Sequence, residues 1–243
     1  MKRPILLVFA HPDDETFGVA GTVLRYTREG VPVELVCATR GEKGSRLDVP
    51  ADMDTGTARE AELRAAATIT GIRRIYLLGY IDGELDTVDA DEIMSKVREI
   101  MRHVQPEVVI TFGPDGITGH GDHVAIGNAA TRAFDKLAGQ ESGPRKLYYV
   151  TIPESAVPHP GELGVATRPD DEVTTTIDIS DYLDMKIQAV AAHRSQRDVR
   201  EFIEMLQKNR ESPFACKEFF YLANLGICGK ETDLFQFQHR VHP

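Results

Sequence analysis

A histidine and three acidic residues stand side by side near the start of the chain. Residues 11–15 read His-Pro-Asp-Asp-Glu and directly follow the apolar run of residues 5–10. A short apolar run that ends at proline is typical of a fully buried strand, so the polar residues follow the carboxyl end of that strand. Imidazole nitrogen and carboxylate oxygen are both good zinc ligands, and a spare carboxylate can act on the attacking water. The segment therefore indicates a site for a divalent metal ion.

A second cluster, His-Gly-Asp-His at residues 120–123, follows a glycine-rich stretch more than a hundred residues later. Its two histidines lie on one face if the backbone there is helical. One of them could bind a metal while the other faces the same cavity. Together with His11 and Asp14, this cluster supplies a His-Asp-His set that leaves one coordination position vacant. Three protein ligands plus water are typical of catalytic zinc, whereas structural zinc is closed by four protein ligands.

The first cluster also has a structural interpretation. Asp13, Asp14 and Glu15 could cap the helix expected to start near residue 16 and favour its positive end. Capping requires one or two such residues, and it requires neither the preceding histidine nor the proline that holds the turn. The chemical interpretation is therefore preferred, and Glu15 is left to cap the helix or to support the site.

Apolar runs and amphipathic segments alternate through the first 150 residues. Strands are predicted at residues 5–10, 33–39, 74–78, 107–112 and 146–150, and helices at residues 16–29, 57–70, 89–104 and 122–137. This alternation predicts an α/β fold, a Rossmann-like three-layer αβα sandwich with a mostly parallel central sheet. In the expected strand order, about 3-2-1-4-5, the first and fourth strands are neighbours. The two polar clusters would then meet at the carboxyl edge of the sheet, where such folds bind ligands.

The pattern loosens after residue 150. Residues 153–171 are rich in proline and glycine and predict a long surface loop that helps to shape the pocket. Beyond it we expect a strand at 173–179, helices from about 180 to 193 and from 196 to 209, and a short apolar segment at 219–225. These C-terminal additions are too small to form a core of their own, so a single domain is predicted over residues 1–243.

Charge and composition exclude several classes of protein. The 243-residue chain has 28 lysines and arginines against 38 aspartates and glutamates, a net charge of −10. An acidic chain without a basic run is a poor partner for nucleic acid or for anionic membranes, and no apolar stretch is long enough to span a bilayer. Cys37, Cys216 and Cys228 form no Cys-x-x-Cys motif, and the N-terminus does not match a signal peptide. A reduced, cytoplasmic setting is expected.

Taken together, the two clusters resemble the motifs of the PIG-L/LmbE-like family of zinc-dependent N-acetylglucosaminyl de-N-acetylases. The residues that carry the resemblance are Ala-His-Pro-Asp-Asp-Glu at 10–15 and Gly-His-Gly-Asp-His at 119–123. Further agreement comes from Thr-Arg-Gly-Glu at 39–42, from Arg59 in the alanine-rich helix that ends at Gly71, and from the stretch 186–196. The resemblance covers about residues 4–200 and implies the same Rossmann-like fold.

Carried over to this chain, the resemblance implies a metal site and a general base. His11, Asp14 and His123 would bind Zn²⁺. Asp13 would accept the proton of the attacking water. Zinc lowers the pKa of bound water toward ~7 and polarises a carbonyl, so this set suits the hydrolysis of an amide.

The resemblance also implies roles around that metal site. His120 would face the substrate carbonyl or the leaving group, and Asp122 would orient either His120 or a metal ligand. Arg59 and Glu42 match positions that contact the sugar. His193 is assigned to substrate binding, although a histidine at a helix end is equally well explained by the helix dipole.

The expected function is therefore the removal of an acetyl group from an N-acetylglucosamine-type amino-sugar conjugate, such as a precursor of a low-molecular-weight thiol. The partner would be a small molecule. His and Asp ligands also suit Fe²⁺, so zinc is the first of two candidate metals. The substrate could instead be another N-acylated small molecule. The sequence leaves open whether the chain forms a homo-oligomer.

Two non-enzymatic functions are alternatives to this one. A Rossmann-like pattern invites a nucleotide-binding module, but such a site requires Gly-x-Gly-x-x-Gly after the first strand, where this chain has three carboxylates that would repel phosphate. A metal-binding assembly protein without catalysis is the other alternative. It is not favoured, because every residue that the chemistry needs is present.

Overall fold

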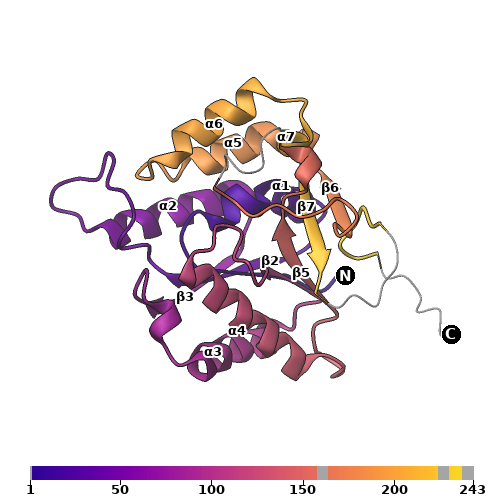
Figure 1. The fold of residues 1–243 in the computed structure, drawn as a ribbon. Helices are drawn as coiled ribbons and strands as arrows, with labels where there is room; N and C mark the ends of the chain where they lie inside the picture. The colour runs from indigo at the N-terminus through magenta and orange to yellow at the C-terminus, as the bar shows by residue number, and fades with distance from the viewer. Residues whose placement is uncertain (1, 158–163, 224–229, 237–243) are drawn as a thin grey trace.

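The computed structural model describes residues 2–157, 164–223 and 230–236, and in this part of the chain a seven-stranded sheet forms the centre of the molecule (Figure 1). Its order is β3-β2-β1-β4-β5-β7-β6. The strands are β1 (Ile5–Phe9), β2 (Val33–Thr39), β3 (Arg74–Tyr80), β4 (Val108–Phe112), β5 (Lys146–Thr151), β6 (Thr175–Asp178) and β7 (Lys217–Leu222). The first five are parallel, and β7 runs antiparallel to β5 and β6. The predicted order 3-2-1-4-5 is confirmed, and β7 and β6 extend the sheet at one edge.

Helices cover both faces of this sheet. One side carries α1 (Asp14–Arg28), α2 (Thr55–Thr70), α5 (Leu183–Ala191), α6 (Asp198–Lys208) and α7 (Pro213–Cys216), and the other carries α3 (Ala90–Val104) and α4 (Gly121–Leu137). The short 3₁₀ helices are η1 (Leu85–Thr87), η2 (Glu154–Ala156) and η4 (Ser180–Tyr182). The α5 helix packs against α1 and α2, and α6 packs on α5. The predicted three-layer αβα sandwich is confirmed.

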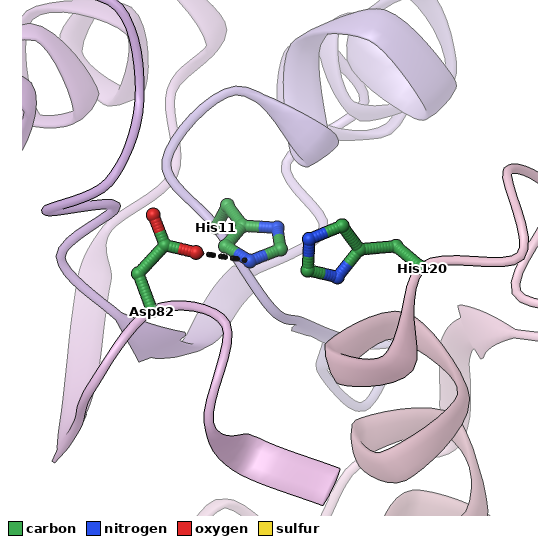
Figure 2. Close-up of side chains that lie close together, drawn as sticks. All are labelled: His11, Asp82 and His120. Carbon is green, nitrogen blue, oxygen red and sulfur yellow. Dashed lines mark ion pairs between the residues drawn. The ribbon is translucent and has the colours of Figure 1, made fainter.

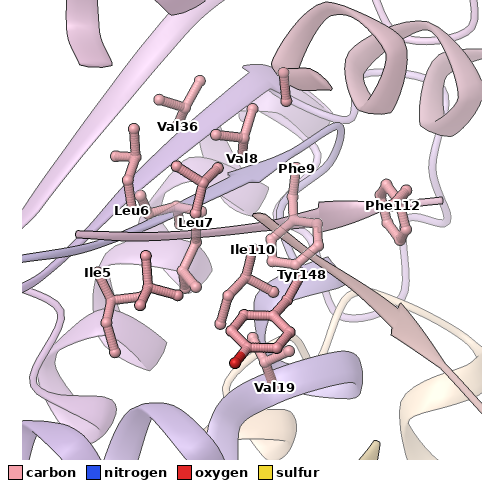
Figure 3. Packing of buried hydrophobic residues seen from close by; sticks show 14 of the residues in the cluster. Ile5, Leu6, Leu7, Val8, Phe9, Val19, Val36, Ile110, Phe112 and Tyr148 are labelled. Atoms are coloured by element: carbon pink, nitrogen blue, oxygen red, sulfur yellow. The ribbon is translucent and has the colours of Figure 1, made fainter. Parts of the chain in front are cut away.

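The β1 strand is apolar throughout, and β4 is apolar except for Thr111, because helices cover both faces of the sheet. Every residue of β1 and of β4 is buried, and Figure 3 shows the side chains of β1 beside Ile110 and Phe112 of β4. Leu7 of β1 stands opposite Ile110 of β4, and the rings of Phe9 and Phe112 meet edge-on with centroids 5.0 Å apart. The two strands therefore end side by side, and the loops that carry the two polar clusters start next to each other.

Several elements begin or end away from the predicted residues. The α1 helix begins at Asp14, so the first polar cluster reaches into its first turn. The α2 helix begins at Thr55 because Asp54 caps it, accepting the N–H of Thr57 at 2.9 Å. The helix predicted from about 180 to 193 divides into η4 and α5. Of the apolar segment predicted at 219–225, residues 219–222 belong to β7, which already begins at Lys217, and residues 224–225 lie outside the described residues.

Three further predictions are tested only in part or not at all. Among the described helices, none is both long and apolar enough to cross a bilayer. The predicted loop at 153–171 contains η2, and its residues 158–163 lie outside the described residues. That residues 1–243 form one domain stays a prediction.

Candidate functional site

The loops that follow β1, β2, β3 and β4 converge at the carboxyl edge of the sheet and line one large cavity. Its volume is about 810 Å³, which falls in the range of ~300–1,000 Å³ common for ligand sites. The polar side chains that line it include His11, Asp13, Asp14, Arg59, Asp82, His120 and His123. The two polar clusters of the sequence therefore share a single cavity, as the strand order requires.

His11, Asp14 and His123 turn their ligand atoms toward one another. Nδ1 of His11 lies 3.2 Å from Nε2 of His123, which in turn lies 3.4 Å from Oδ1 of Asp14. Oδ2 of Asp14 lies 3.7 Å from Nδ1 of His11. Ligand atoms at ~2.0–2.1 Å from a tetrahedral zinc ion are about 3.3 Å apart, so these separations fit a divalent metal. The structure thus brings the three predicted metal ligands together as one group.

Each histidine of this group has its other ring nitrogen held by an acceptor. Nε2 of His11 lies 3.1 Å from a carboxylate oxygen of Asp122 and 3.1 Å from one of Asp82. Nδ1 of His123 lies 3.0 Å from the carbonyl oxygen of Gly116. Metal-binding histidines are typically oriented by carboxylates and carbonyls in this way. The surroundings of the group therefore also fit a metal ion.

Opposite charges set the protonation of the group. Burial lowers the pKa of His11, but Asp122, Asp82 and Asp14 outweigh burial and raise it to about 10. Burial alone would raise the pKa of Asp14, yet His123 and His11 hold it well below its usual range. A metal ion that binds here must displace a proton from the His11 ring, as metal binding to histidine generally does.

Asp122 points toward His11 and not toward the ring of His120. Its Oδ2 accepts the N–H of Gly83 at 2.7 Å in addition to facing His11, and its Oδ1 accepts the N–H of Leu85 at 3.0 Å. The side chain is buried. Asp122 was predicted to orient either His120 or a metal ligand. The geometry supports the second role, with His11 as the ligand, and Asp122 is not among the residues that line the cavity.

Asp82, for which the sequence suggested only a weak substrate role, is a partner of His11. It follows β3, and its Oδ2 accepts the N–H of Lys43 at 2.9 Å while its Oδ1 faces His11 (Figure 2). Its position after the third strand, at the same sheet edge as the two clusters, indicates a place near the site but does not predict the contact with His11.

His120 caps the start of α4 at the mouth of the cavity. Its ring stands edge-on to that of His11, with centroids 4.8 Å apart (Figure 2). Its Nδ1 accepts the N–H of Asp122 at 3.2 Å, so a neutral His120 ring carries its proton on Nε2. Burial lowers its pKa, and the neighbouring His11 and His123 lower it further. His120 also forms, with His11 and Asp82, a second group whose ligand atoms lie close together.

Asp13 joins β1 to α1 in a backbone conformation that residues other than glycine rarely adopt, with φ of 123°. Its N–H donates to Oε2 of Glu15 at 3.0 Å, and its Oδ2 accepts from Nη2 of Arg59 at 2.8 Å. Burial raises the pKa of Asp13 to about 6, although the positive charge of Arg59 opposes this. Strained residues that their neighbours hold in place are often part of a functional site.

Arg59 lines the cavity, but its guanidinium is tied to the chain. Besides Asp13, it bonds the carbonyl oxygen of Gly41, which accepts from Nη1 at 3.0 Å. A Cβ at Gly41 would lie 2.1 Å from that Nη1, so only glycine permits this approach. Glu42 is half-buried, and its Oε2 accepts the N–H of Asp82 at 3.4 Å. Both predicted sugar-binding residues are therefore near the cavity, and their contact with a sugar stays a prediction.

His193 does not lie where the sequence prediction placed it. Its side chain is fully buried, and its Nε2 lies 3.0 Å from Oε1 of Glu15, whose other oxygen accepts the N–H of Asp13. A buried side chain cannot touch a substrate in this conformation, so the prediction that His193 binds the substrate directly is wrong. Burial lowers the pKa of His193, but Glu15 and then Asp13 outweigh it and raise that pKa. His193 instead stands behind Glu15, as a support for Asp13.

The chain is similar to several known proteins. Residues 6–134 match the family model PIG-L, described as GlcNAc-PI de-N-acetylase. A 1D-myo-inositol 2-acetamido-2-deoxy-alpha-D-glucopyranoside deacetylase of Saccharomonospora viridis is 31% identical, over 95% of this chain and 99% of its own length. A probable N-acetyl-alpha-D-glucosaminyl L-malate deacetylase 2 of Bacillus cereus is 35% identical, over 82% of this chain and 86% of its own length.

Solved structures share the fold at lower identity. An N,N'-diacetylchitobiose deacetylase from Pyrococcus horikoshii superimposes with a TM-score of 0.69 at 21% identity, covering 90% of this chain and 83% of its own. GalB, a 4-carboxy-2-hydroxymuconate hydratase from Pseudomonas putida, gives the same TM-score at 20% identity, covering 95% and 99%. Because a deacetylase and a hydratase share this architecture, the fold alone does not select the reaction.

Proposed function

The chain belongs to the PIG-L family of GlcNAc-PI de-N-acetylases, and on this basis we propose that it removes the acetyl group from an N-acetylglucosamine-type conjugate by metal-dependent hydrolysis. The observation that carries the proposal is the group of His11, Asp14 and His123 with Asp13 beside it in one cavity. Relatives named for inositol and malate conjugates of the amino sugar support a small-molecule substrate. Zn²⁺ is the proposed metal, and Fe²⁺ is the second candidate because the same ligands suit it.

In the proposed reaction His11, Asp14 and His123 hold the metal, which supplies a Lewis acid for the amide carbonyl and lowers the pKa of the attacking water. Asp122 and Asp82 keep the His11 ring in place from behind by accepting a hydrogen bond from its Nε2–H group. The two carboxylates and the three ligands act as one unit. A carboxylate that faces Nε2 of His11 keeps the proton on that nitrogen, and the lone pair of Nδ1 is then free to bind the metal.

Asp13 is the proposed general base. Its Oδ2 is engaged by Arg59, so the water proton goes to Oδ1 and can pass from there to the leaving amine. A pKa of about 6 brings Asp13 near neutral pH, where a general base works best, while Arg59 keeps it from rising further. The strained backbone and the bond from its N–H to Glu15 fix the direction of the carboxylate.

His120 is the proposed donor to the oxygen that becomes negative as the water attacks. Its Nδ1 accepts a backbone N–H, so its Nε2 carries a proton even when the ring is neutral. The low pKa that its neighbours impose therefore does not prevent it from donating a hydrogen bond. A single donor of this kind is worth roughly 3–4 kcal/mol of transition-state stabilisation.

The proposal is tested with a panel of N-acetylglucosamine conjugates and zinc-loaded protein. We expect release of a primary amine, measured with a fluorogenic amine reagent, from at least one of the inositol conjugate, the malate conjugate, N,N'-diacetylchitobiose and the methyl glycoside. Chelator-treated protein is the control and should release none. If the zinc-loaded protein and the chelated protein give the same signal with every compound, the proposed function is wrong.

The buried pair of His193 and Glu15 gives a prediction about support for the general base. Replacing His193 with leucine is expected to lower kcat by about 10–100-fold with little change in KM, as loss of an outer partner commonly does. His193→Gln keeps an N–H donor near the position of Nε2 and should recover most of the loss. Steady-state kinetics with metal content measured in parallel would check this. If leucine and glutamine lower kcat equally, His193 acts by packing alone.

A further inference from the structure

The cavity extends past the metal group into an arm with a different character. We name this the apolar arm and define it by Phe17, Val150, Phe202, Met205, Phe214 and Phe219. These residues come from α1, β5, α6, α7 and β7, the elements on the side of β5 and β7. On the opposite side the same cavity is lined by Lys43, Arg59 and Asp82. The apolar side chains of the lining thus come from other elements than Lys43, Arg59 and Asp82, although Asp198 and Glu201 of α6 and Lys217 of β7 line the cavity as well.

The aromatic side chains of the apolar arm pack on one another without being fully covered. The ring centroids of Phe17 and Phe202 are 4.7 Å apart, and those of Phe202 and Phe214 are 6.1 Å apart. All three rings, together with Met205, are only half-buried. Apolar surface left open to water costs free energy in proportion to its area, so the arm is suited to being filled.

Two of the charged side chains that line the cavity on this side, Lys186 and Glu218, already have partners in the chain, whereas Asp198, Glu201 and Lys217 line it as exposed side chains. Lys186 and Glu218 are both buried, and Nζ of Lys186 lies 2.7 Å from Oε1 of Glu218. The carboxylate of Glu218 also accepts the N–H groups of Gly21 and Thr22, at 2.9 and 2.7 Å. A polar occupant would compete with these bonds, whereas an alkyl or aryl group leaves them intact.

The apolar arm is close enough to the metal group to be filled by the substrate itself. Phe17 lies one turn after Asp14 on α1, so their side chains lie on the same face of that helix, and both line the cavity. A molecule whose amide is held at the metal group can therefore reach the arm with another part of its own structure.

We propose that the substrate is an amino-sugar conjugate that carries an apolar group of several carbons, and that this group occupies the apolar arm. The inference rests on the proposed function and deepens it by naming the substrate class. The side of the cavity lined by Lys43, Arg59 and Asp82 takes the sugar. The apolar group can be attached on either side of the amide, as the aglycone or as an N-acyl chain longer than acetyl, and its chemistry is the same in both cases. Inositol or malate alone would leave the arm unfilled.

Two series of compounds test the proposal with zinc-loaded protein. One varies the aglycone of N-acetylglucosamine from methyl to butyl to hexyl, and the other varies the N-acyl chain of methyl glucosaminide from acetyl to butanoyl to hexanoyl. We expect KM to fall in one series by up to about fourfold per methylene, which corresponds to ~0.8 kcal/mol per buried methylene. The series that responds identifies the position of the apolar group. Flat KM values in both series, with the methyl glycoside hydrolysed, overturn the inference and leave the proposed function standing.

Binding without turnover separates the two proposals further. Calorimetry with hexyl glucoside should show a Kd at least tenfold below that of methyl glucoside. If no conjugate is hydrolysed but hexyl glucoside binds more tightly, the proposed function fails and the apolar arm stands. Equal binding of the two glucosides, together with flat KM values or no turnover, overturns the inference.

A variant locates the effect in the apolar arm. Phe202→Ser should reduce the ratio of kcat/KM for the hexyl compound to that for the methyl compound by about tenfold in the responding series. Ile203→Ser is the matched control, because Ile203 is equally half-buried on α6 and is not among the residues that line the described cavity. If Phe202→Ser does not fold, judged by circular dichroism, Met205→Ser serves in its place. An unchanged ratio in the folded variant contradicts the inference.

Discussion

Protein that carries Asp13→Asn is expected to bind its metal normally and to hydrolyse amide roughly 10²–10⁴-fold more slowly than the wild type, the usual contribution of a general base. The asparagine oxygen can still accept the hydrogen bond from Arg59, and the backbone bond to Glu15 is untouched. Only the ability to take a proton is lost. The measurements are kcat on the best conjugate of the panel and metal content by mass spectrometry.

The control for this variant is an aspartate of the same type away from the cavity. Asp52 is exposed, so Asp52→Asn should leave both kcat and metal content unchanged. A full rate in Asp13→Asn would remove Asp13 from the chemistry. Loss of metal in Asp13→Asn would instead place it among the ligands, and the role proposed for Asp14 would then need revision.

The sheet order could be predicted because strands that are buried on both faces have a recognisable sequence pattern. Continuous apolar runs such as that of β1 occur where helices cover both sides of a parallel strand, and the strand–helix alternation leaves few topologies to choose from. Element ends were harder to predict, since they depend on single caps. The start of α2 moved to Thr55 because of one hydrogen bond from Thr57 to Asp54.

The three metal-binding candidates could be predicted because two short motifs held them and the strand order brought the motifs together. The partners behind them were not predictable in the same way. Asp82 comes from a third loop, and its contact with Nε2 of His11 depends on how the β3 loop turns. The predicted role of His193 in substrate binding was wrong because the packing of α5 on α1 buries this residue. Its partner Glu15 lies on α1, 178 residues earlier in the chain, so the sequence does not indicate their contact.

The apolar arm illustrates a limit of hydrophobic periodicity. Phe17 stands at helical spacing in α1, and the sequence pattern cannot distinguish a side chain that faces the core from one that faces a cavity. The difference arises from α6 and α7, which contribute Phe202, Met205 and Phe214 to the arm from the far end of the chain. Only the packing of these helices over α1 shows that the space between them remains open.

Replacing His123 with alanine is expected to abolish activity by removing the metal, whereas replacing His120 with alanine should keep the metal and lower kcat by about 10²–10³. The loss of metal affinity in His123→Ala should exceed the 10–100-fold that removal of an outer partner costs. Metal content after dialysis and competition with a chromophoric chelator would measure both variants. The pair is informative because two groups compete for the metal: His11 with Asp14 and His123, and His11 with Asp82 and His120.

His11 belongs to both groups, so a variant of His11 cannot decide between them, and the choice depends on which of its ring nitrogens has a free lone pair. Two carboxylates face Nε2, at 3.1 Å each, and favour a proton there. Nδ1 then faces Nε2 of His123 and the carboxylate of Asp14 with its lone pair available. The Asp14–His123 group is therefore the one that a metal should occupy. Metal retained in His123→Ala and lost in His120→Ala would show that the proton sits on the other nitrogen and that the second group holds the ion.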